Sequence, residues 1–143
     1  MKVDVATTSS RVDLRYSRYT SSFNPLASST QRDLLQELIG VLLLRKPDVL
    51  LPADLGSARF VVAHHEQLSA HTTVVDIADE ETFEAASNKW ELAKILNSAS
   101  IAHPATALGS AGGEHSVDSD HLQPPLIVKP VDGSNGRGIS VVS

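Results

Sequence analysis

Short apolar stretches alternate with longer amphipathic ones along the first two thirds of the chain. Residues 3–7 (VDVAT) alternate apolar and polar positions, as a half-buried strand does. Two short apolar runs, 48–52 (DVLLP) and about 73–77 in TTVVDIA, are typical of strands buried between layers of a parallel sheet. We expect these three strands to lie in one mostly parallel sheet.

The stretches between the strands predict helices. A first helix is expected over about 30–45, where Thr30 and Asp33 fit a capping box and apolar residues recur every three or four positions. It should end before Pro47, because the residue preceding a proline avoids helical backbone. A second helix is expected over 54–69. The serine-rich segment 9–29 is interpreted mainly as loop.

Two more helix starts follow the last of these strands. Asp79 is placed to cap a short helix that runs through Ala86. Ser87 or Asn88 is placed to cap the next helix, KWELAKILNSA, with Glu91 in its first turn. The order strand, helix, strand, helix, strand favours an α/β layer fold with right-handed crossovers. Beyond Ala99 the pattern becomes extended and then glycine-rich, which predicts a flexible loop.

The chain closes with PPLIVKPVDGSNGRGISVVS, in which a glycine-rich loop joins two β-branched runs, 126–131 and 139–142. The loop of mononucleotide-binding proteins ends in Gly-Lys-Ser/Thr and opens a helix, and this loop does neither. The dinucleotide fingerprint Gly-x-Gly-x-x-Gly also opens a helix. Here the order is Gly-x-x-Gly-x-Gly and a strand follows, so both motifs are excluded.

Two interpretations of this hairpin remain open from the residues alone. Asn135-Gly136 is a strong signal for an ordinary hairpin turn, and Lys129 has the alternative of facing solvent. However, three glycines within six residues exceed what such a turn needs. Glycine lets backbone amides approach a ligand closely, and successive amides form a nest for an anion. The loop and Lys129 together therefore favour phosphate binding.

Composition limits the ligands and partners to consider. Twelve basic against 17 acidic residues give a net charge of −5, which argues against nucleic acid and anionic membranes but allows a small anion held by one or two lysines. Cysteine is absent and the six histidines show no ligand spacing, so no metal site is predicted. The start of the chain lacks the apolar stretch of a secretory signal, and we expect a cytoplasmic protein.

Three stretches carry a resemblance to a known family. The hairpin LIVKPVDGSNGRGI resembles the glycine-rich hairpin of the ATP-grasp superfamily. The stretch SNKWELAKILNSASIAHPAT resembles the segment that precedes this hairpin in the family, in which a lysine opens a helix. Upstream, PDVLLPADLGSARFVVAHH is similar to the Rossmann-like domain of carbamoyl-phosphate-synthase-like and D-alanine-ligase-like proteins. The resemblance implies an incomplete Rossmann-like domain with a mostly parallel sheet over 1–86, and the start of an ATP-grasp domain over 87–143.

The resemblance also implies a function and a site. The chain is expected to be the ATP-binding portion of a ligase that activates a carboxylate as an acyl-phosphate for attack by an amine or similar nucleophile. The residues that would contact the phosphates are Lys89, Lys129, Gly133, Ser134, Asn135, Gly136 and Gly138.

The chain does not match the whole family pattern. The family's magnesium-binding carboxylates and asparagine, and its adenine-binding hinge, have no counterpart in the sequence. We therefore expect an N-terminal or middle fragment that binds ATP weakly and is inactive alone, with no catalytic residue assigned. The alternative is a noncatalytic nucleotide-binding or assembly module. Residues 109–143 are expected either to be disordered or to gain order by pairing, through the hairpin 126–143, with a second copy or a partner chain.

Overall fold

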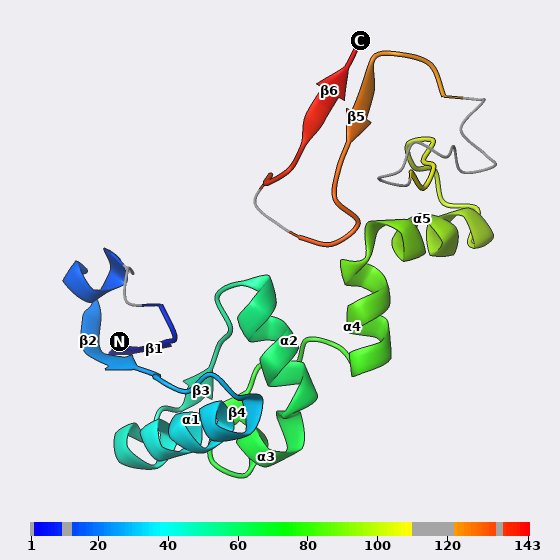
Figure 1. Cartoon of the computed structure of the whole chain (residues 1–143). Coiled ribbons are helices and arrows are strands. Elements are labelled where there is room, and N and C mark those ends of the chain that lie inside the picture. Colours follow the sequence, from blue (N-terminus) through cyan, green and yellow to red (C-terminus); the bar gives the residue numbers. More distant parts are fainter. Residues whose placement is uncertain (1, 10–12, 110–121, 134–135) are drawn as a thin grey trace. The chain divides into compact units, whose positions relative to one another are not determined.

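A computed structural model describes residues 2–9, 13–109, 122–133 and 136–143 (Figure 1). The protein is mixed α/β, with short parallel and antiparallel sheets, and it divides into two compact units, 1–77 and 78–143. The domain boundary expected after residue 86 falls inside the second unit, in the last turn of the helix Glu80–Ser87.

The first unit begins with a parallel pair of strands. β1 (Val3–Thr7) pairs with β2 (Thr20–Pro25), and a short 3-10 helix, η1 (Asp13–Tyr16), lies between them in sequence. The expectation of loop over 9–29 is therefore wrong at β2. The strand is stabilised by Asn24, which is buried and whose side-chain amide donates to the Val5 carbonyl at 3.1 Å. Side-chain bonding of this kind leaves no apolar pattern in the sequence.

Helix α1 (Gln31–Arg45) follows the sequence prediction closely. The hydroxyl of Thr30 accepts a hydrogen bond from the Asp33 backbone N–H at 3.2 Å and caps the first turn. The helix ends at Lys46, whose left-handed backbone (φ 49°) comes directly before Pro47.

A β–α–β segment completes the first unit. β3 (Val49–Leu50) pairs in parallel with β4 (Thr73–Val74), and α2 (Leu55–Ala63) and α3 (His65–Ser69) lie between them in sequence. The single helix expected over 54–69 is broken at His64, where φ is −120° and ψ is 21°. The His64 ring packs edge-on against Phe60, with ring centroids 4.6 Å apart, and α3 takes a new course from this residue.

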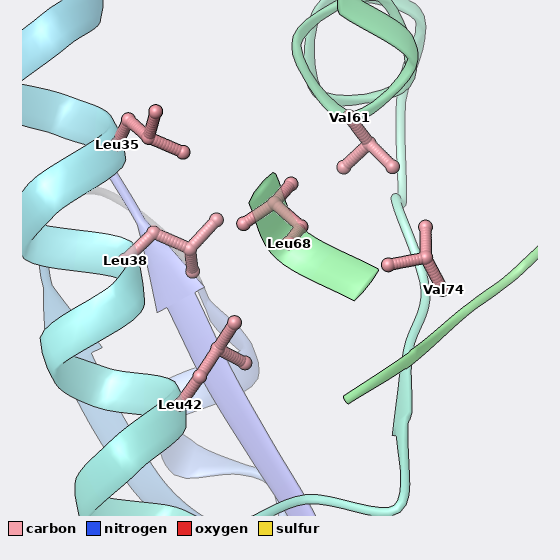
Figure 2. Packing of buried hydrophobic residues seen from close by; sticks show 6 residues of the cluster. All are labelled: Leu35, Leu38, Leu42, Val61, Leu68 and Val74. Atoms are coloured by element: carbon pink, nitrogen blue, oxygen red, sulfur yellow. The ribbon is translucent and has the colours of Figure 1, made fainter. Parts of the chain in front are cut away.

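The core of the first unit lies where α1, α2, α3 and β4 meet (Figure 2). Leu68 of α3 is fully buried at its centre. The buried apolar side chains of this core are Leu35, Leu38, Leu42, Val61, Leu68 and Val74.

Two expectations about the sheet are corrected. Among the described residues, β1 and β2 form one two-stranded sheet and β3 and β4 another, so the three predicted strands do not share a sheet. The two runs that were expected to be buried also have exposed positions, since Val49 is 52% and Leu51 is 71% exposed in the first and Ile77 is 38% exposed in the second. The β3–β4 pair spans only two residues on each strand, which leaves much of both apolar runs outside the ladder.

The second unit contains two helices and the hairpin. α4 (Glu80–Ser87) and α5 (Lys89–Ser98) pack against each other and bury Phe83 and Ala93. β5 (Leu126–Val128) pairs antiparallel with β6 (Ser140–Val142), so the predicted hairpin is confirmed in its described residues.

Both predicted helix starts in the second unit are confirmed. The Asp79 carboxylate accepts hydrogen bonds from the backbone N–H and then from the hydroxyl of Thr82, and these bonds lower the pKa of Asp79. The side-chain oxygen of Asn88 accepts from the backbone N–H groups of Trp90 at 3.0 Å and Glu91 at 3.1 Å. No helix in the described parts of the chain is long and apolar enough to cross a membrane.

Candidate anion-binding site

The start of α5 is bonded to the entrance of the glycine-rich loop. Lys89 is the first residue of the helix, and its backbone N–H donates to the Val131 carbonyl at 3.1 Å. Its ammonium group donates to the Gly133 carbonyl at 2.9 Å and to the Val131 carbonyl at 3.4 Å. The cap at Asn88 fixes the first turn of the helix, and these bonds place the loop entrance beside it.

Lys129 reaches the same place from the hairpin. It directly follows β5, and it lines a pocket of about 160 Å³ together with Lys89. The residues around this pocket are Lys89, Lys129, Pro130, Gly133, Gly136, Arg137 and Ile139. The structure therefore brings together four of the predicted site residues, and Gly138 lies next to Arg137. Ser134 and Asn135 lie outside the described residues.

The loop backbone needs glycine at three of its positions. Gly133, Gly136 and Gly138 have φ values of 110°, 72° and 72°, in the region that side chains rarely adopt. At Gly138 a Cβ atom would also lie 2.7 Å from Cγ of Pro130. The glycine spacing in the sequence thus reflects the backbone conformation of the loop and its close approach to Pro130.

Arg137 is the pocket residue that the sequence analysis missed. It lies between two glycines of left-handed conformation and lines the pocket beside the two lysines. Its position inside the glycine loop could have indicated it, because a basic side chain in that loop lies close to the backbone amides that would bind an anion. A guanidinium presents several N–H donors in a fixed fork that suits phosphate oxygens.

The described residues that line the pocket carry charge of one sign. They include three cationic side chains and no acidic one, although the whole chain carries a net charge of −5. Within the described residues, the side chains of Lys129 and Arg137 have no hydrogen-bond or ion-pair partner. Clustered like charges repel one another, and an anion between them relieves that repulsion.

An apolar surface lies on the hairpin next to the pocket. Ile127 and Val141 face each other across the two strands and are 62% and 69% exposed. The hairpin that carries Lys129 and the glycine loop therefore also carries an exposed apolar pair.

A larger hollow of about 280 Å³ lies in the first unit, between the end of β2 and α1. Its one charged lining residue is Glu37. The Glu37 carboxylate already accepts hydrogen bonds from the Ser28 hydroxyl at 2.6 Å and the Ala27 N–H at 2.8 Å, and these bonds lower its pKa. We interpret Glu37 as a structural residue that links α1 to the segment before it, because hydrogen-bond donors of that segment occupy its carboxylate oxygens.

The arrangement in the second unit is suited to binding an anion. No group of histidine, aspartate and glutamate side chains able to hold a metal ion occurs in the described part of the chain. The chain matches no protein-family model, no curated protein and no solved structure.

Proposed function

We propose that the pocket of the second unit binds the polyphosphate of ATP. The observation that carries this proposal is the convergence of three cations from separate segments on one pocket. Lys89 comes from α5, Lys129 from the end of β5, and Arg137 from the glycine loop. The loop backbone, with its left-handed glycines, adds amide groups that suit an anion.

In the wider proposal the chain is the ATP-binding portion of a carboxylate ligase of the ATP-grasp kind. In such a ligase ATP phosphorylates a carboxylate, and an amine or similar nucleophile then displaces the phosphate. The part of Lys89, Lys129 and Arg137 is to neutralise phosphate charge and hold the polyphosphate against the loop amides. The described residues do not fit a magnesium site, and we derive no step through that ion.

The test is titration with ATP, followed by NMR chemical shifts. The pocket is small and lies among exposed residues, where salt screens charge interactions, so we expect a dissociation constant on the order of 1 mM. Lys129→Met keeps much of the apolar stem and removes the charge. It should weaken binding by about tenfold, since one close charge interaction contributes about 1 to 4 kcal/mol.

Lys94→Met is the matched control, because Lys94 lies on the same helix as Lys89. Its ammonium group pairs with Glu91 at 2.7 Å and it does not line the pocket. ATP affinity should therefore be unchanged in this variant. Equal losses in both variants would mean that only general charge matters. Micromolar affinity for ATP would contradict the expectation of weak binding.

A second candidate function is assembly through the hairpin. An isolated two-stranded hairpin is marginally stable in water, and its edges offer unpaired backbone groups to another strand. The exposure of Ile127 and Val141 favours this candidate. We propose that a second copy of the chain covers the hairpin 126–143.

Sedimentation equilibrium over a range of concentrations tests the assembly. We expect a reversible dimer, and Val141→Lys should shift the equilibrium to monomer because it places a charge in the contact. Val49→Lys is the control, since Val49 is comparably exposed but lies in the first unit. Strong amide protection of Ile127, Val128 and Val141 in a monomer, independent of concentration, would refute assembly.

A further inference from the structure

Lys89 differs from the other two cations of the pocket in having partners inside the chain. Its ammonium donates to the carbonyls of Gly133 at 2.9 Å and Val131 at 3.4 Å. Lys129 and Arg137 have no such partner within the described residues. Lys89 therefore holds the loop entrance and lines the pocket at the same time.

These two tasks compete once a ligand takes more than one N–H of the ammonium group. The group has three N–H donors, and two of them are directed to neutral carbonyl oxygens, which leaves one for a ligand. A phosphate oxygen carries charge, so its hydrogen bond to the ammonium is the stronger one. The backbone N–H of Lys89, which donates to Val131 at 3.1 Å, takes no part in this competition.

We propose that the Lys89 ammonium exchanges partners when a polyphosphate binds. In the free chain it is a positioning group that holds Gly133 against the first turn of α5. In the bound state it turns to the phosphate and releases the Gly133 carbonyl, while its backbone N–H keeps Val131 in place. The proposal rests on the proposed function and adds a conformational coupling to it.

The direction of the effect on ligand affinity follows from this exchange. A ligand that takes the ammonium from Gly133 must break that bond, so the free-state bond lowers the affinity for the ligand. By linkage, the ligand weakens the hold on Gly133 by the same factor. The release is confined to Gly133, because the Val131 carbonyl keeps its backbone partner.

The measurement is the NMR coupling across the hydrogen bond between Nζ of Lys89 and the carbonyl carbon of Gly133. We expect this coupling in the free wild-type chain and its loss when inorganic triphosphate saturates the pocket. Sodium chloride at the same ionic strength should leave it in place. A coupling that is absent in the free chain, or one that persists with triphosphate bound, overturns the proposal.

Two variants separate this proposal from the proposed function. Lys129→Met should lose triphosphate affinity and keep the free-state coupling, because Lys129 has no bond to the loop entrance. Lys89→Met should lose affinity and also shift the Gly133 carbonyl resonance without ligand. If triphosphate does not bind the wild type, the exchange fails together with the proposed function. The Lys89–Gly133 bond of the free chain is then tested alone, by the NMR coupling in the wild type without ligand.

Discussion

At the residue scale, the close approach of Gly138 to Pro130 constrains the glycine loop. Gly136 and Gly138 have the same φ of 72°, yet their surroundings differ. A Cβ atom on Gly136 would meet nothing within 4 Å, whereas one on Gly138 would lie 2.7 Å from Cγ and 3.3 Å from Cδ of Pro130. The two positions therefore separate the cost of backbone conformation from the cost of a steric clash.

We predict that Gly138→Ala destabilises the hairpin more than Gly136→Ala does. The left-handed conformation costs an L-residue about 1 to 2 kcal/mol, and both variants incur that cost. Gly138→Ala adds the clash with a proline ring, whose atoms cannot rotate away. Amide exchange of Ile127 and Val141 measures the stability of the strand pair.

A double-mutant cycle with Pro130→Ala identifies the cause. Removing the ring should recover the additional loss in Gly138→Ala and leave the loss in Gly136→Ala unchanged. Equal losses in the two glycine variants would show that the contact with Pro130 does not constrain the loop.

Two of the three cations that line the pocket could be predicted from the sequence. Lys129 stood out in a β-branched strand, and Lys89 was assigned through the family resemblance, and both line the pocket. Arg137 was missed because an arginine in a polar loop is unremarkable by type. It lies between two glycines of positive φ, a backbone feature that residue patterns indicate only indirectly.

At the element scale, the helices were more predictable than the strands. The sequence predicted the caps of α1 at Thr30 and of α5 at Asn88, because a capping side chain bonds to backbone groups within three positions of it. β2 was missed because its stability depends on pairing with β1 and on the bond from Asn24 to Val5. Those partners are remote in sequence, and no local pattern records them.

The break of the helix at His64 depends on tertiary packing. The apolar spacing over 54–69 is compatible with one straight helix, and tertiary packing decides otherwise. The ring of His64 lies against Phe60, and α3 then directs Leu68 into the core (Figure 2). Val61 and Leu68 of this segment both reach the core, where they join residues of α1 and β4.

At the scale of the whole molecule, the division into two compact units separates core from candidate site. The core around Leu68 belongs to unit 1–77, and every residue that lines the cationic pocket belongs to unit 78–143. Among the described residues of the second unit, the buried apolar side chains are Phe83 and Ala93. The division therefore predicts that damage to the core and damage to the pocket are separable.

The prediction at this scale is that Leu68→Ala destabilises the first unit and leaves the pocket intact. Leu68 has no exposed surface and lies at the centre of the cluster, so truncation should cost about 2 to 5 kcal/mol. This is a large fraction of the stability of a unit of this size, about 0.05 to 0.15 kcal/mol per residue. Urea unfolding followed by the amide resonances of α1 measures the loss.

Leu44→Ala is the control, because Leu44 lies in the same unit and is 72% exposed. The Lys89–Gly133 coupling and the triphosphate shifts should be unchanged in both variants. If Leu68→Ala also abolishes them, the two units fold as one, and the pocket depends on the core of the first.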